Sequence, residues 1–307
     1  MPILRTAPNP ADSVPAPALP RLRPGKLCVA IQAGSAGEMV ERGAAALADT
    51  KFIEFRLDSL AKPAEALPAL KGFMAAHRDV TAIATCRRKQ FGGHFVGSLT
   101  SEFDVLFKAA EAGCQIVDLE VESAEEAKPA VLEKFREGLR AVGAALLVSF
   151  HDFTRTKNLE HAAQRIQAFA PEFVKVVSTA KSLADNLAVM RLIEDRSLSA
   201  QVVGIAMGEE GLVSRVLGPR AGAAFTFASF SHGAETAPGQ VTARTLRDLY
   251  RVEQLDQATR IFGVAGNPDR HSRRQCTLRT LPRRARVRRG RNPHPAESSR
   301  GSRRPSV

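Results

Sequence analysis

The stretch FIEFRLD, residues 52–58, decides the architecture of this chain. Successive side chains of a β-strand point to opposite faces of a sheet. Here the alternation separates two sets, the apolar Ile53, Phe55 and Leu57 and the charged Glu54, Arg56 and Asp58. A strand that is apolar on one face and charged on the other favours a closed barrel whose interior opens into a polar site. An open parallel sheet, covered by helices on both faces, is more often apolar on both.

Seven further apolar runs of strand length flank this one. The eight predicted strands cover residues 26–32, 52–58, 81–87, 115–121, 146–152, 173–179, 202–208 and 224–230. Stretches with helical periodicity lie between them, among them 36–49, 125–143 and 180–196. Alternating strands and helices indicate parallel pairing through crossover helices. Eight such units predict an α/β fold of the (β/α)8 TIM-barrel type over residues 26–252, with a doubly wound open sheet as the alternative.

The segments on either side of the predicted barrel differ from it in composition. Residues 1–25 are rich in proline and lack the apolar core of a secretory signal, which predicts a disordered leader. Residues 260–307 contain fourteen arginines, no lysine and two acids, which accounts for the whole formal net charge of +12. The body is therefore formally neutral, and 253–307 is predicted to be a linker followed by a disordered basic tail.

Composition also limits the class of protein. No window of about 18 apolar residues exists, so we expect no membrane-spanning helix. The four cysteines, at positions 28, 86, 114 and 276, form no CxxC pair and no metal-binding spacing with histidine. These features favour a reduced, cytoplasmic enzyme without a metal site.

Ionisable residues gather where the predicted strands end, which is where barrel enzymes build their active sites. The candidates are Glu54, Arg56, Asp58, Arg87, Asp118, Glu120, His151, Asp152 and Lys175. Lys175 lies among valines and a phenylalanine in FVKVV, and a lysine is rarely buried without a partner or a function. Because adjacent strands lie about 4.8 Å apart, Lys175 and His151 are expected to face one small volume.

Two interpretations of Lys175 follow. In an apolar wall near other cations, a lysine has its pKa lowered, and the neutral amine can attack a ketone to form a Schiff base. A neighbouring histidine then suits proton removal from the adjacent carbon and protonation of a leaving group. The alternative is a structural ion pair with Asp118 or Glu120. For Glu54 and Arg56 the alternative is likewise an ion network that only fills the barrel interior.

Two loops add neutral and cationic donors at the same predicted barrel mouth. MGEEGLVSR, residues 207–215, follows the seventh strand and presents Arg215. TAPGQ, residues 236–240, follows the eighth and offers Thr236 and Gln240 around a tight Pro-Gly turn. Arginine is suited to bidentate binding of a carboxylate.

Six motifs in register resemble the type I 3-dehydroquinate dehydratase family. They are EFRLD (54–58), TCR (85–87), SFHDF (149–153), FVKVV (173–177), MGEEGLVSR (207–215) and APGQ (237–240). The resemblance spans about residues 26–252. It implies a TIM barrel, often a homodimer, that uses no metal or organic cofactor and dehydrates 3-dehydroquinate in the shikimate pathway of chorismate and aromatic amino acid biosynthesis.

The same resemblance implies roles for individual residues. Lys175 would form the imine and His151 would act as general base and acid, whereas Arg215 and Gln240 would bind the substrate carboxylate. Glu54, Arg56 and Arg87 would contact the ring hydroxyls. Thr236 keeps the hydroxyl of the serine that is usual at its position. One position departs from the pattern, because Phe91 replaces a glutamate that supports the histidine, and this change predicts reduced activity rather than none.

The chain continues past the barrel into IFGVAGNPDRHS, residues 261–272, which resembles the start of shikimate dehydrogenase. The rest of that enzyme is not present, so no dehydrogenase activity is expected. A remnant of a bifunctional ancestor is one explanation of the tail. We expect no specific nucleic-acid partner, because no aromatic residue follows Phe262 to stack on bases. Two alternatives for the barrel are a different Schiff-base aldolase and a catalytically impaired barrel that acts as a binding module.

Overall fold

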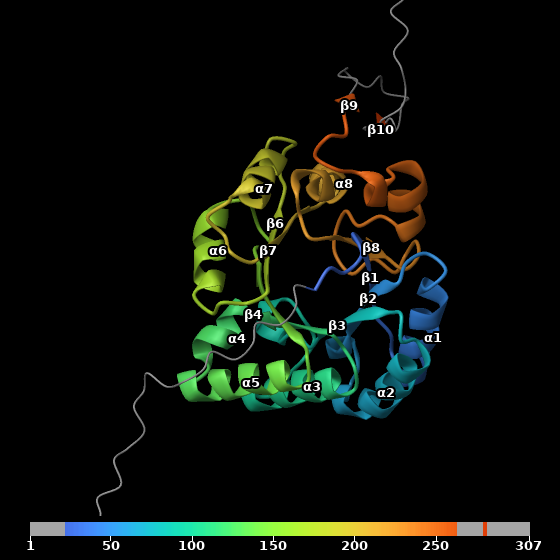
Figure 1. The fold of residues 1–307 in the computed structure, drawn as a ribbon, viewed down its shortest axis with the longest axis vertical. Helices are drawn as coiled ribbons and strands as arrows, with labels where there is room; N and C mark the ends of the chain where they lie inside the picture. Colours follow the sequence, from blue (N-terminus) through green and yellow to red (C-terminus); the bar gives the residue numbers. More distant parts are fainter. Residues whose placement is uncertain (1–21, 263–278, 281–307) are drawn as a thin grey trace, which may run out of the picture.

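In the computed structural model, eight parallel strands form one sheet that curls into a barrel, and the helices surround it (Figure 1). The structure describes residues 22–262 and 279–280; the predicted leader therefore lies almost entirely outside the described residues. The strands pair in the order β7-β6-β5-β4-β3-β2-β1-β8. The predicted TIM barrel is confirmed, and the open doubly wound sheet is excluded.

The strand bounds follow the apolar runs closely. The strands are β1 (Leu27–Ile31), β2 (Phe52–Arg56), β3 (Thr81–Thr85), β4 (Ile116–Glu120), β5 (Ala145–His151), β6 (Phe173–Thr179), β7 (Gln201–Met207) and β8 (Thr226–Ser229). Between β7 and β8 the ring closes through one backbone hydrogen bond, from the Ala224 N–H to the Val202 carbonyl at 2.8 Å. The two short strands β9 (Ile261–Phe262) and β10 (Arg279–Thr280) pair with each other outside the barrel.

The helices follow one another around the barrel from α1 to α8 (Figure 1). They are α1 (Ala36–Ala46), α2 (Leu67–Ala76), α3 (Leu99–Glu111), α4 (Val121–Glu126), α5 (Pro129–Ala141), α6 (Leu159–Gln167), α7 (Asp185–Glu194) and α8 (Leu212–Ala221). Short 3-10 turns cover Leu57–Ser59, Pro63–Ala66, Lys89–Phe91, Glu209–Gly211 and Val252–Gln254, and Thr245–Leu249 is a π-helical turn. No helix in the described part is long and apolar enough to cross a membrane.

The alternation seen in FIEFRLD divides the core into two layers. Ile53, Phe55 and Leu57 belong to the larger cluster, which the strands form with the surrounding helices. A second cluster fills the barrel interior, where Phe52, Phe173 and Phe225 pack edge to face. Above this apolar floor the interior turns polar, beginning with Glu54 and Lys175, each of which is less than 5% exposed. The barrel interior therefore consists of an apolar layer with a layer of charged side chains above it.

Candidate active site

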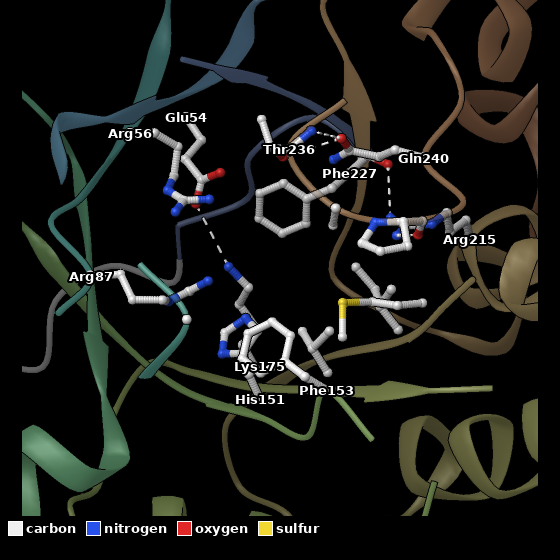
Figure 2. A pocket seen from close by; sticks show the side chains of 16 residues that line it. Glu54, Arg56, Arg87, His151, Phe153, Lys175, Arg215, Phe227, Thr236 and Gln240 are labelled. Atoms are coloured by element: carbon white, nitrogen blue, oxygen red, sulfur yellow. Dashed lines mark hydrogen bonds and ion pairs between the residues drawn. The ribbon is translucent and has the colours of Figure 1, made fainter. Parts of the chain in front are cut away.

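The carboxyl ends of the strands surround one cavity, which opens to solvent at the barrel mouth. All eight predicted site residues line it, namely Glu54, Arg56, Arg87, His151, Lys175, Arg215, Thr236 and Gln240. Figure 2 shows them on two sides, with Lys175, His151, Arg87, Arg56 and Glu54 on one side and Arg215, Thr236 and Gln240 on the other. The ring of Phe227 lies between the two sides.

Lys175 has ionic partners as well as a place on the cavity wall. Its Nζ donates to Asp118 Oδ2 at 2.7 Å and lies 3.7 Å from Glu54 Oε1. It also sits 4.3 Å from the centre of the Phe227 ring. The sequence predicted that Lys175 lies in an apolar wall near other cations. This prediction was incomplete, because two carboxylates face the amine. The ion pair with Asp118 considered from the sequence is present, and it coexists with access to the cavity.

Asp118 is held as a carboxylate by the cations around it. Burial alone would raise its pKa, but the charges of Lys175 and Arg87 outweigh burial and lower the pKa to about 2. Ser149, which lies between Asp118 and Lys175 on the intervening strand β5, donates its hydroxyl to Asp118 Oδ1 at 2.6 Å. The negative partner of Lys175 therefore persists at any physiological pH.

His151 closes the same side of the cavity at the end of β5. Its side chain is only 6% exposed, and its ring stacks on Phe153 with centroids 5.9 Å apart. Burial, together with the positive charges of Arg87 and Lys175, lowers the pKa of His151 well below its usual range. The imidazole is therefore neutral at neutral pH and can accept a proton.

The three remaining polar residues on this side form bonds that fix their orientation. Arg56 donates to both oxygens of Asp58, from Nε at 2.9 Å and from Nη2 at 2.8 Å. Glu54 Oε1 accepts the Thr85 hydroxyl at 2.7 Å. Arg87 binds Glu120 through Nε, and its Nη2 has no hydrogen-bond partner within the described residues. Each of these side chains keeps donor or acceptor capacity for a bound molecule.

The opposite side of the cavity is built around Arg215, which the first turn of α8 carries. Arg215 is 1% exposed, and within the described residues its guanidinium makes two long contacts, to the carbonyls of Pro238 at 3.3 Å and Phe227 at 3.5 Å. Nε has no partner within the described residues. Burial lowers the pKa of Arg215 to about 10. A buried guanidinium that lacks an anionic partner indicates a place for an anion.

Gln240 is oriented as a donor beside this arginine. Its Oε1 accepts from the Thr236 backbone N–H at 2.7 Å and from the Thr236 hydroxyl at 3.1 Å. The amide NH2, which has no partner in the part of the chain that the structure describes, can therefore donate toward the cavity. Gly239 makes the turn possible, since its φ is +71° and a Cβ there would lie 2.1 Å from the Gly208 carbonyl oxygen. The loop that leads from β7 into α8 and the loop that carries Gln240 are thereby packed backbone to backbone.

The apolar lining of the cavity was not predicted from the sequence. Val177, Ile205, Met207, Phe227 and Phe153 form it. The first four belong to the interior cluster and share a strand face with residues of the barrel floor, so the period of two along each strand was the signal that could have identified them. Phe153 lies in SFHDF directly after the strand and is 48% exposed. Together these side chains make an apolar belt between the two polar sides.

The fold and this cavity define a (β/α)8-barrel protein with a polar site at the carboxyl ends of its strands. The family model described as type I 3-dehydroquinase matches residues 27–257. The 3-dehydroquinate dehydratase of Dehalococcoides mccartyi is 32% identical over 211 residues, covering 68% of this chain and 88% of that protein. The chain therefore belongs to the type I 3-dehydroquinase family.

Two further relatives bear on the fold and on the tail. The crystal structure of the Geobacillus kaustophilus 3-dehydroquinate dehydratase superposes with a TM-score of 0.66 at 21% identity, covering 75% of this chain and 91% of that one. At this identity the likeness concerns the fold alone. The chloroplastic bifunctional 3-dehydroquinate dehydratase/shikimate dehydrogenase of Arabidopsis thaliana is 32% identical over 256 residues. This chain spans 41% of that protein's length. The predicted dehydrogenase-like start (261–272) lies outside the matched family model, and all but its first two residues lie outside the described residues.

Proposed function

We propose that this chain dehydrates 3-dehydroquinate to 3-dehydroshikimate and water through a Schiff base on Lys175. Family membership supports the reaction, and the cavity supports the division of roles. The observation that carries the proposal is the pairing of a buried, cavity-facing lysine with a neutral histidine, opposite an arginine that lacks an anion. One side thus suits chemistry at a ketone, and the other suits binding of a carboxylate.

Substrate binding follows from the free donors. Arg215 and the Gln240 amide would bind the carboxylate, with the Thr236 hydroxyl and backbone holding the amide in place. Glu54, Arg56 and Arg87 would contact the ring hydroxyls on the other side. The apolar belt between them matches the carbon skeleton of a six-membered ring. A substrate that is charged at one end and carries hydroxyls at the other is thereby oriented with its ketone toward Lys175.

The reaction proceeds in four steps that release one water in total. The Lys175 amine attacks the C3 ketone and expels its oxygen as water, which gives an iminium. His151 removes a proton from C2, and the electron pair flows into the iminium to give an enamine. The enamine expels the C1 hydroxyl, which His151 protonates. Hydrolysis of the resulting imine consumes one water, releases 3-dehydroshikimate and restores the lysine.

Two properties of the protein as a whole belong to the same proposal. We expect a cytoplasmic location and a homodimer, as the family resemblance implies. Size-exclusion chromatography with light scattering checks the second expectation. A monomer at micromolar concentration would contradict it.

Trapping with borohydride tests the covalent step. The protein is incubated with 3-dehydroquinate, reduced with sodium borohydride and digested, and the modified peptide is identified by mass spectrometry. We expect a stable adduct on Lys175 and none in Lys175→Ala. Lys181→Ala, which changes an exposed lysine at the same end of the barrel, should leave the adduct unchanged. A folded wild-type protein that forms no adduct and does not turn over substrate would disprove the proposal.

A further inference from the structure

Two buried polar atoms face each other beside the reacting lysine. His151 Nδ1 lies 3.5 Å from Glu120 Oε2, and neither atom has a hydrogen-bond partner within the described residues. The side chains are 6% and 2% exposed. An unsatisfied buried polar atom is costly, and a hydrogen bond between these two would satisfy both.

The other carboxylate oxygen of Glu120 already has polar partners, and this leaves Oε2 for the histidine. Its other oxygen, Oε1, accepts from Arg87 Nε and lies 3.2 Å from the Ser149 hydroxyl oxygen. Strand register fixes the arrangement, since Glu120 is paired directly with Ser149. His151 is two residues further along β5 and so projects from the same face.

Asp152, which follows His151 in the sequence, is bonded elsewhere. Asp152 Oδ1 accepts from the Thr154 N–H at 2.8 Å, the Thr154 hydroxyl at 2.6 Å and the Arg155 N–H at 3.1 Å. It therefore caps its own loop. Phe91 has no acceptor, and its ring lies 5.1 Å from the Arg88 guanidinium.

We propose that Glu120 is the positioning residue for His151: Oε2 accepts a hydrogen bond from Nδ1–H and holds the tautomer in which Nε2 is the base. The two ring nitrogens are distinct, and a partner on one determines which lone pair is available on the other. The separation of 3.5 Å fits a ligand-free site, where catalytic hydrogen bonds are often long and shorten when the substrate binds. The proposal rests on the proposed function, which makes His151 the base.

Because its surroundings keep the His151 ring neutral, the position of its single ring proton decides which nitrogen can act as the base. The ionisable groups facing His151 are Arg56 from β2, Arg87 from the end of β3, Asp118 and Glu120 from β4 and Lys175 from β6. Burial, Arg87 and Lys175 keep the ring neutral by lowering its pKa. Once the ring takes the C2 proton it becomes a cation, and Glu120 Oε2 then stabilises that charge directly.

Nitrogen-15 NMR of the histidine-labelled full chain measures the tautomer without requiring turnover. The His151 signals are assigned by their loss in His151→Asn. We expect protonated Nδ1 and unprotonated Nε2 at pH 7 in the wild-type protein. Wild-type His151 protonated at Nε2 instead would overturn the proposal, whether or not Glu120→Gln folds.

Kinetics of Glu120→Gln provide the second measurement. Loss of an oriented base lowers rates by roughly 10²-fold or more, so we expect that fall in kcat with KM little changed. The His151 ring should become a mixture of tautomers, and borohydride should still trap the adduct on Lys175. Glu126→Gln is the matched control, because Glu126 is an exposed partner of the neighbouring Arg88.

Other results would overturn the positioning role. An unchanged kcat in Glu120→Gln would show that His151 needs no such partner. Loss of the Lys175 adduct in a folded Glu120→Gln would show that Glu120 serves the lysine rather than the histidine. Absence of turnover in the wild-type protein would refute the proposed function but would leave the tautomer result standing.

Discussion

Lys175 and Asp118 form a buried ion pair across the barrel interior, with Nζ 2.7 Å from Oδ2 and strand β5 between their two strands. Both side chains are at most 5% exposed. A buried pair of this kind adds little stability over an apolar replacement, but removal of one member takes away the nearest partner of the other buried charge. The pair therefore links the stability of the barrel to the chemistry of its lysine.

Asp118→Asn should destabilise the fold strongly. Removing one partner of a buried pair typically costs about 3–5 kcal/mol. The pKa of Asp118 is lowered to about 2 in the folded state, so its contribution is complete above the ordinary aspartate pKa and is lost as pH falls through about 2. Urea unfolding should show a large difference from wild type at pH 7 and a smaller one at pH 3.

Asp104→Asn is the control for this measurement. Asp104 pairs with Lys108 at 2.8 Å on the exposed surface of α3. Exposed pairs of this spacing contribute only about 0.3–0.5 kcal/mol. A destabilisation of Asp118→Asn as small as that of the control would show that the Lys175 ion pair is not structurally important.

Glu102 should make the free energy of unfolding depend on pH with a sign opposite to that of Asp118. This carboxyl is buried beneath the loop after β3, where it accepts from the Ser123 hydroxyl at 2.8 Å. Burial raises its pKa to about 7. A folded-state pKa above the unfolded value means that the stabilising contribution is complete below about pH 4.5 and is lost as pH rises through 7.

Glu102→Gln should remove that dependence. Relative to the variant, wild type should lose at most about 3 kcal/mol of unfolding free energy between pH 4.5 and 8, as a shift of this size implies. Unfolding in urea across this range measures the difference. Glu133→Gln, on the exposed face of α5, is the control and should show the same pH dependence of unfolding free energy as wild type. If Glu102→Gln also showed the wild-type pH dependence, the prediction would be contradicted.

The fold was predictable because its strands are bounded apolar runs. The predicted runs 173–179 and 52–58 contain β6 and β2, although the end of the latter turns into the 3-10 segment Leu57–Ser59. The helices were less well defined. The stretch 125–143 has helical periodicity, but the structure divides it between two helices, since α4 ends at Glu126 and α5 begins at Pro129. Proline lacks the N–H needed inside a helix and favours its first turn.

The residues of the site were predictable from the sequence, but the ion pairs that they form were not. Alternation along the strands places Lys175 and His151 on the interior face, which local sequence can show. It cannot show that Asp118 rather than Glu120 binds the lysine, because that choice depends on the stagger between strands and on side-chain rotamers. The isolation of Arg215 from any carboxylate is likewise a property of the assembled loops.

Arg215→Met should weaken substrate binding without lowering the stability of the fold. The guanidinium is buried without an anionic partner, so an apolar side chain of similar length should keep or raise the free energy of unfolding at pH 7. Loss of a charge-assisted contact to the substrate should raise KM by roughly 10-fold to 10²-fold, since such bonds contribute about 1.5–3 kcal/mol.

Thermal melts with and without 3-dehydroshikimate provide the matching readout. The product should raise the melting temperature of wild type and have little effect on Arg215→Met. Arg220→Met, on the same helix but bonded to the Thr259 carbonyl, should retain the ligand effect. A variant that is strongly destabilised, or that still responds to the product, would argue against an anion site at Arg215.

Phe91→Glu tests whether this chain has replaced the missing carboxylate by another. The family pattern places a glutamate at position 91 to support the histidine, whereas here Glu120 Oε2 already faces His151 Nδ1 at 3.5 Å. We therefore expect Phe91→Glu to leave kcat nearly unchanged. It should cost only the contact with Arg88, about 0.5–1 kcal/mol of stability.

In the Glu120→Gln background the same change should recover part of the lost rate, because the family pattern uses a glutamate at this position to support the histidine. Steady-state rates of the two single variants and the double variant, each compared with Lys175→Ala, measure this directly. A rise in kcat of more than about tenfold in Phe91→Glu alone would mean that Nδ1 lacks an effective partner in the natural chain, since partners of this kind contribute about 10-fold to 100-fold.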